Sequence, residues 1–292
     1  MKLSVLMSVY CKESPFFLRQ SLDSLVAQSL PADEVVIVED GPLGEELEAA
    51  IDSYRSLLPI VSLRLPVNGG LGAALREGLQ VCRGEFVARM DSDDICLPGR
   101  FQAQMGFLER NPSVDVVSGT WAEFDEDCSR PHSLRRLPAT GPALLRYAKF
   151  RNPINHVTAV FRRSAVLAAG NYQSFPGFED YHLWARMLML GYRLHNIEEI
   201  LVCVRVGNGM QGRRGGFSYF MREIEFQSYL LGLGLLTRRE YICNILLRAP
   251  IRLTPAFVRA LCYRLFLRRR FAAGSRLAWR GGSLRLSGLA GK

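Results

Sequence analysis

Three carboxylates stand close together at the end of an apolar run, in the segment FVARMDSDDICLPGRF (86–101). Asp91, Asp93 and Asp94 fall within four positions, and like charges this close repel one another and resist desolvation. A hard divalent cation offsets such repulsion because it takes oxygen ligands. Asp91 and Asp93 form an Asp-x-Asp pair, whose side chains lie on the same side of an extended segment. The pattern therefore suits a divalent cation, which would bridge carboxylate and phosphate oxygens if a nucleotide diphosphate is also bound.

A plainer interpretation of these carboxylates stays open. The Asp91–Asp94 segment also suits a turn that leads into the N-cap of the next helix, and an Asp-x-Asp alone does not separate the two. Asp40, in VEDG, could be a loop-entry residue or the phosphoacceptor of a receiver-type domain. Receivers are much shorter than this chain, and nothing in them requires the second acidic cluster.

A further acidic pair, Glu179 and Asp180, begins a predicted helix. Acidic residues suit the positive end of a helix dipole, which is one explanation for the pair. The other is catalysis, because a carboxylate can take the proton of an acceptor hydroxyl while the oxygen attacks.

Arginines follow in the loop VRVGNGMQGRRGG (204–216). Arg205, Arg213 and Arg214 could hold a diphosphate through paired hydrogen bonds, or the segment could be a solvated basic loop. The loop is no P-loop, because Arg-Arg stands where Lys-Ser/Thr is required.

Strands and helices alternate around these residues. Apolar runs without an in/out polar pattern, separated by helical spacing, predict a parallel sheet buried on both faces. Ligands bind beyond the carboxyl ends of such strands, so we expect Asp40 and the Asp91–Asp94 segment to converge at one crevice. The first four strands are predicted at 3–10, 33–41, 60–66 and 85–91.

After the fourth strand, strands and helices alternate less regularly. From 217 on, we expect helices with Arg on one side and apolar residues on the other. We therefore divide the chain into a domain at 1–216 and a basic helical tail at 217–292. Further elements are predicted as a helix at 97–112, a strand at 115–124, a polar loop with a short helix at 125–150, a strand and helix at 157–170, a helix at 178–192 and a strand from 199.

Charge is divided unevenly along the chain. The 292 residues carry a net charge of +9, but residues 205–292 hold 16 Arg and 1 Lys against 3 Glu, whereas residues 1–204 hold 20 basic and 25 acidic residues. Such asymmetry suggests a polyanionic partner for the tail. Large apolar residues interleave the arginines, which favours an anionic membrane surface. Nucleic-acid binding and simple packing on the core are the alternatives.

Cysteine usage and the start of the chain indicate the compartment. The seven cysteines are odd in number and include no C-x-x-C, which argues against a disulfide framework or a zinc knuckle and fits a reducing cytosol. MKLSVLMSVY lacks the features of a signal peptide, and no apolar stretch approaches the roughly 18 residues needed to span a bilayer. We expect a cytoplasmic protein.

Taken in order, the motifs resemble glycosyltransferase family 2, and in particular bacterial exopolysaccharide and O-antigen transferases. The resemblance covers roughly residues 3–216. It implies an α/β fold of the GT-A type, with a Rossmann-like, mostly parallel central sheet flanked by helices and a C-terminal basic helical extension. The motifs that carry it are SVLMSVY, PADEVVIVEDG, NGGLGAALREG, GEFVARMDSDDICLPGRF, FLERNPSVDVVSG, RNPINHVTAVFRRSAV, FEDYHLWARMLMLGY and VRVGNGM.

The resemblance also implies site residues. Asp180 is the implied catalytic base with Glu179 as its neighbour, Asp93 and Asp91 bind the metal, and Asp94 supports their loop. No histidine follows His195, so the histidine that some members carry beyond the Arg205 position is lacking. The residues implied to bind the nucleotide-sugar are Ser8, Tyr10, Asp40, Arg76, Asp91, Ser92, Arg205, Arg213 and Arg214.

The reaction implied is inverting, metal-dependent transfer of a sugar from a nucleotide-sugar, usually a UDP-sugar, to a hydroxyl of a polyprenyl-diphosphate-linked saccharide. The enzyme would then be peripheral on the inner face of the cell membrane, with no nucleic-acid partner. Two other classes of function are the alternatives. A sugar nucleotidyltransferase would show a Gly-rich basic loop where SVYCKESP stands, and a non-catalytic nucleotide- or nucleic-acid-binding protein has no use for Glu179 and Asp180.

Overall fold

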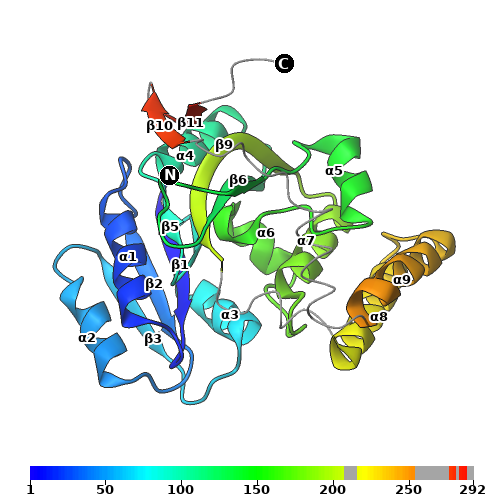
Figure 1. Cartoon of the computed structure of the whole chain (residues 1–292), viewed down its shortest axis with the longest axis horizontal. Helices are drawn as coiled ribbons and strands as arrows, with labels where there is room; N and C mark the ends of the chain where they lie inside the picture. The colour runs from blue at the N-terminus through cyan, green and yellow to red at the C-terminus, as the bar shows by residue number, and fades with distance from the viewer. Residues whose placement is uncertain (207–215, 254–275, 281–282, 288–292) are drawn as a thin grey trace.

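A curled sheet with helices on its faces forms the body of the protein (Figure 1). A computed structural model describes residues 1–206, 216–253, 276–280 and 283–287. The strand order in the main sheet is β3-β2-β1-β4-β8-β6-β9-β5, and β7 pairs with β6. Arg213 and Arg214 lie outside the described residues, so the part of the arginine loop that contains them is not described.

The first half of the sheet is parallel, as the sequence predicts. The segments β1 (Leu3–Val9), β2 (Glu34–Glu39), β3 (Ile60–Arg64) and β4 (Phe86–Asp91) pair in parallel. Their apolar runs are buried on both faces, which explains why they lack an in/out polar pattern. The connecting helices are α1 (Pro15–Val26), α2 (Glu45–Ser53) and α3 (Leu71–Val81).

The second half of the sheet is mixed. Strand β8 (Val160–Arg162) is antiparallel to β4 and to β6 (Val116–Phe124), whereas β9 (Leu194–Arg205) runs parallel to β6. Two short strands were not predicted, because two or three residues carry too little pattern to be recognised. These are β5 (Ile95–Cys96) and β7 (Ser133–Arg135).

Two apolar cores lie on opposite faces of the sheet. One packs α1, α2 and α4 (Arg100–Arg110) against it, and the other packs α3, α6 (Arg163–Ala168) and α7 (Glu179–Met189). The residues of β4 alternate between the cores: Phe86, Ala88 and Met90 belong to the first and Val87 to the second. The odd-numbered positions of β4 therefore face the side that α3 and α7 cover. The short helix expected within 125–150 is α5 (Gly141–Ala148).

The tail begins as predicted and then departs from the prediction. Helices α8 (Phe217–Gly232) and α9 (Arg238–Leu253) form a hairpin beside α7. Residues 276–287 are not helical: β10 (Arg276–Arg280) and β11 (Ser283–Ser287) pair antiparallel. The expectation of helices throughout is wrong here. In RLAWRGGSLRLS, large apolar residues stand at every second position on each side of Gly-Gly (Leu277, Trp279, Leu284 and Leu286), which is a hairpin signal. Among the described helices, none combines the length and apolar composition that crossing a bilayer requires.

One disulfide corrects the expectation drawn from the cysteines. Cys128 and Cys203 are bonded across 75 positions of sequence, which ties the 125–132 loop to β9. Cysteine count and spacing could not reveal this pair, because the fold brings the two residues together from distant segments. The free thiols of the described residues are Cys11, Cys82, Cys96 and Cys243.

Candidate active site

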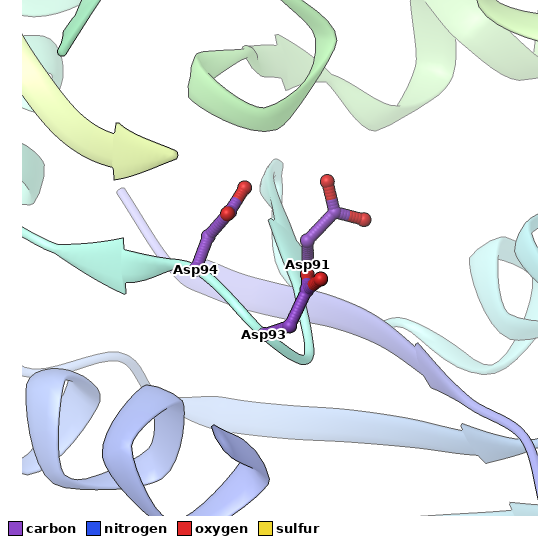
Figure 2. Close-up of side chains that lie close together, drawn as sticks. All are labelled: Asp91, Asp93 and Asp94. Carbon is purple, nitrogen blue, oxygen red and sulfur yellow. The ribbon is translucent and has the colours of Figure 1, made fainter. Parts of the chain in front are cut away.

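The three clustered carboxylates occupy the tight turn between β4 and β5 (Figure 2). Asp91, Asp93 and Asp94 each offer a carboxylate oxygen, and these oxygens all lie within 4.8 Å of one another. The segment is a turn and not the extended stretch expected for the Asp-x-Asp. The turn brings in Asp94 as well, so three carboxylates converge instead of two.

Electrostatic repulsion is strong at this turn. Burial, with repulsion from Asp91 and Glu13, raises the pKa of Asp93 to about 7. Burial, with repulsion from Asp91 and Asp93, raises the pKa of Asp94 well above its usual value. A divalent cation would offset this repulsion, and the donors are the hard oxygens that Mg and Mn prefer. The residues therefore fit such a cation.

A buried arginine lies beneath the turn. Arg89 is 3% exposed and its guanidinium is ion-paired with Asp91. Both are odd-numbered positions of β4, so they share the face covered by α3 and α7. Within the described residues the Nε of Arg89 has no hydrogen-bond partner. Sequence reasoning missed Arg89, although an arginine inside an otherwise apolar strand, two positions before an aspartate, is a usable signal.

The end of β9 braces the other side of the turn. The backbone N–H of Arg205 donates to Oδ1 of Asp94 at 2.8 Å, and its guanidinium donates to the carbonyl of Asp93 at 3.2 Å and to Gln20 at 2.6 Å. The same guanidinium stacks on Phe17, 4.0 Å from the ring centroid, and its Nη1 donates a long 3.5 Å hydrogen bond to a backbone carbonyl. Arg205 thus supports the loop, as Asp94 was expected to do, and a contact with the diphosphate stays a prediction.

Ser92 is also built into the turn. Its hydroxyl donates to Oε2 of Glu13 at 2.6 Å, and the other oxygen of Glu13 accepts the backbone N–H of Ser14. The turn is therefore tied to the loop that follows β1.

The predicted nucleotide-binding residues Ser8 and Asp40 lie at the same edge of the sheet as the acidic turn. Ser8 stands opposite Asp91 on one side and Val38 on the other in the β1 register, and Asp40 follows directly after β2. Asp40 and Asp91 thus lie at the same edge of the sheet, on either side of the end of β1, and a shared crevice stays a prediction. The carboxylate of Asp40 is buried and accepts the backbone N–H groups of Gly69 at 2.8 Å and of the next residue at 3.0 Å.

Two other predicted residues differ in their surroundings. Tyr10 is half-buried in the loop just beyond β1. Arg76, on α3, has an exposed side chain that pairs with its neighbour Glu77. The described contacts do not bring Arg76 to the acidic turn.

The second acidic pair opens helix α7. Asp180 accepts a hydrogen bond from Nδ2 of Asn152 at 2.5 Å on one oxygen and from the backbone N–H of Tyr181 at 2.7 Å on the other. Glu179 accepts the backbone N–H of Gly177, and burial together with the charge of Asp180 raises the pKa of Glu179. Asn152 therefore orients the carboxylate that was predicted as the base, a contact that sequence reasoning missed.

Helix α3 links Asp40 to the start of α7. Its first turn follows the glycines that Asp40 holds, and Gly72 within that turn faces Glu179: a Cβ added to Gly72 would lie 3.3 Å from the Cβ of Glu179. Any larger residue would press on the start of α7. Arg89, which pairs with Asp91, also opposes the rise in the pKa of Glu179. Together the two acidic sites could hold a cation with a diphosphate and deprotonate a hydroxyl.

Known proteins resemble the chain in sequence. The family model described as Glycosyl transferase family 2 matches residues 4–169. The amylovoran biosynthesis glycosyltransferase AmsE of Erwinia amylovora is 41% identical over 260 residues, which cover 89% of this chain and 97% of that protein. The Escherichia coli UDP-Gal:alpha-D-GlcNAc-diphosphoundecaprenol beta-1,3-galactosyltransferase is 35% identical over 268 residues, covering 92% and 97%.

A solved structure shares the fold. The structure of S. aureus TarS 1-349 in complex with UDP-GlcNAc matches with a TM-score of 0.66 at 20% identity, covering 92% of this chain and 76% of that chain. This likeness confirms the GT-A fold class predicted from the sequence.

Proposed function

The chain belongs to glycosyltransferase family 2, and from this premise we propose that it is an inverting, metal-dependent hexosyltransferase of bacterial surface polysaccharide biosynthesis. It transfers a sugar from a nucleotide-sugar to a hydroxyl of a lipid-linked saccharide. One observation supports the proposal: Arg89 pairs with Asp91 of the acidic turn, and its charge also acts on Glu179, the neighbour of the Asn152-held Asp180. Membership of this family argues against a sugar nucleotidyltransferase and against a non-catalytic binding protein.

The donor in this proposal is a UDP-sugar. The complex of TarS with UDP-GlcNAc, a protein of the same fold, supports a uridine nucleotide. Asp40 hydrogen-bonds the base, with Ser8 and Tyr10 beside it, and Asp91 contacts the ribose. We assign the diphosphate to Arg205, Arg213 and Arg214, and keep Arg76 and Ser92 as further pocket residues.

A divalent cation held by Asp93 and Asp91 would supply positive charge that stabilises the departing nucleoside diphosphate. Asp180 takes the proton of the acceptor hydroxyl, and that oxygen forms a bond to the anomeric carbon from the face opposite the diphosphate. The bond from the anomeric carbon to the diphosphate oxygen breaks, and its electron pair leaves with the nucleotide. Asn152 keeps the carboxylate of Asp180 in position for this transfer.

The acceptor is a polyprenyl-diphosphate-linked saccharide. The Escherichia coli relative is named for a diphosphoundecaprenol-linked acceptor, which supports this class. Such a lipid lies in a membrane, so the division into a catalytic domain at 1–216 and a membrane-associated basic tail at 217–292 is part of the proposal. The enzyme is then peripheral on the cytoplasmic face, and nucleic acid is not its partner.

Calorimetric titration of UDP into the full-length protein tests the donor site, first with Mn²⁺ and then with EDTA. We expect binding that requires the metal, and its loss in Asp93→Asn. GDP, dTDP and CMP serve as controls for the base. Failure of every nucleotide with metal present would overturn the nucleotide-sugar assignment. Transfer is then measured with the donor sugars of the nucleotide that binds.

A further inference from the structure

Helix α9 turns an apolar stripe away from the protein. Ile242 is 54% exposed, and Leu246 and Leu247 are each 66% exposed. These positions recur at helical spacing, so they lie on one side of the helix. Large apolar side chains gathered on one exposed face indicate an interaction surface. We call this surface the outer stripe, and its members are Ile242, Cys243, Leu246, Leu247 and Pro250.

The opposite side of α9 is anchored to the body by polar contacts. Asn244 is 2% exposed and donates to the carbonyl of Lys149 at 2.8 Å, and Glu240 pairs with the side chain of Lys149 at 2.8 Å. One turn further, Arg248 pairs with Glu223 of α8, which is fully buried. These contacts fix the rotation of α9 about its axis, so the outer stripe faces away from the body of the protein.

The charge around the stripe points to an anionic partner. Arg238 and Arg239 are exposed at the start of α9. In the sequence, the 22 residues that follow α9, 254–275, contain five Arg and no acidic residue. Apolar side chains flanked by arginine are what the interface of an anionic bilayer binds, because the stripe enters the acyl boundary while the guanidinium groups meet the phosphates.

The hairpin also contacts the helix that carries the proposed base. Phe178, which precedes Glu179, stacks on Phe226 of α8 with ring centroids 4.6 Å apart and lies 5.6 Å from the ring of Tyr219. Tyr181 packs on Phe226 as well, at 4.8 Å. The start of α7 is therefore held at a fixed position relative to α8 and α9.

We infer that the outer stripe of α9 inserts into the interface of an anionic membrane and sets the orientation of the active site toward it. The inference rests on the proposed function, because only a lipid-linked acceptor requires this orientation. Docking through the stripe holds Asp180 beside the surface from which the acceptor sugar projects. A second copy of the chain is the competing occupant.

Cys243 lies in the stripe and serves as the probe. The full-length C11S/C262S protein is labelled at Cys243 with a polarity-sensitive dye and mixed with phosphatidylglycerol vesicles. We expect a blue shift, quenching by lipids that carry a quencher near the headgroup, and weak response to neutral phosphatidylcholine. The unlabelled Ile242→Ser/Leu246→Ser protein should partition at least about tenfold less, since two apolar side chains no longer enter the bilayer.

A matched variant separates the stripe from general hydrophobicity. Leu57→Ser/Val67→Ser removes side chains that are 60% and 70% exposed at the α2–β3 side of the sheet, and it should partition as the unchanged protein does. UDP binding reports that both variants are folded.

Three outcomes overturn the inference. Vesicle binding that leaves the dye unshifted, and that the stripe variant retains, would mean that another part of the tail docks, and the proposed membrane association would stand. No vesicle binding at all would remove the membrane from the proposed function as well, while UDP binding would still test the donor site. A dimer by light scattering that the stripe variant converts to a monomer would identify the stripe as a contact between copies.

Discussion

Arg89 and Asp91 form an ion pair on strand β4 in which the arginine side chain is 3% exposed and the aspartate side chain is 36% exposed. The pair joins the apolar core beneath α3 and α7 to the acidic turn. The charge of Arg89 opposes the rise in the pKa values of Asp93 and Asp94 that burial and mutual repulsion cause. The protein thus supplies part of the positive charge that the three carboxylates require.

Removing that charge should weaken the fold. Arg89→Gln leaves Asp91 without this ion pair beside two more carboxylates. We expect the free energy of unfolding to fall by about 2 kcal/mol. This is below the 3–5 kcal/mol typical of a fully buried pair, because Asp91 is partly solvated. Urea unfolding measures the change. Arg55→Gln is the control, since its pair with Asp52 is exposed and should contribute less than about 1 kcal/mol. Equal losses in both variants would show that Arg89 has no special role.

Metal should stabilise the protein more at neutral than at acid pH. The pKa of Asp93 is raised from its ordinary value of 3.8 to about 7 in the folded protein. Between pH 3.8 and about pH 7, the folded state therefore holds a proton that the unfolded chain has lost. The metal-free protein therefore loses stability as the pH rises through this range. A cation replaces the proton, so the Mn²⁺-induced rise in Tm should be larger at about pH 7.5 than at about pH 5.5.

Asp93→Asn is the control for this pH dependence. It removes a proposed metal ligand whose raised pKa causes the expected pH dependence, so the difference between the two pH values should shrink. An Mn²⁺ effect of the same size at both pH values in the unchanged protein would contradict the prediction.

The sequence predicted the parallel half of the sheet and the position of Asp40 and Asp91 at one sheet edge, because both follow from local patterns. Unbroken apolar runs indicate buried strands, and the direction of parallel strands brings their carboxyl ends to one edge. Only the residue types were needed to name the three aspartates as candidate ligands of a cation.

Contacts between distant segments could not be predicted in this way. Asn152 reaches Asp180 across 28 positions, and Cys128 reaches Cys203 across 75. No spacing rule relates such residues, since only the folded chain brings them together. Arg205 illustrates a further limit: its residue type suggested a phosphate contact, while its described hydrogen bonds hold the acidic turn.

Asp180→Asn should abolish transfer while preserving donor binding. The amide cannot accept the proton of the acceptor hydroxyl, so kcat should fall by at least about 100-fold. UDP affinity by calorimetry should stay nearly unchanged, because Asp180 is distinct from the acidic turn. Full activity in this variant would remove Asp180 from the role of base.

Asn152→Ala tests the support of that base. Asp180 keeps its chemistry but loses the donor at 2.5 Å, so we expect kcat to fall by about tenfold through poorer positioning. Asn111→Ala is the control, since its side chain bonds only to the backbone of α4 among the described contacts. A KM change without a kcat change would point to acceptor binding instead of orientation.

Glu223 should be essential for the α8–α9 hairpin. It is fully buried between Arg248 and Arg252, which are 19% and 13% exposed on their side chains. Glu223→Gln removes the carboxylate with which both largely buried guanidinium groups pair, and we expect the free energy of unfolding to fall by about 3 kcal/mol. Amide hydrogen exchange should accelerate within 217–253 and leave the acidic turn unchanged, because the two sites share no described contact.

Glu240→Gln is the control, since its pair with Lys149 is 26% exposed on both sides and should contribute less than about 1 kcal/mol. Exchange that accelerates equally across β1 to β4 would mean that the hairpin and the sheet unfold as one unit, and that Glu223 does not act locally.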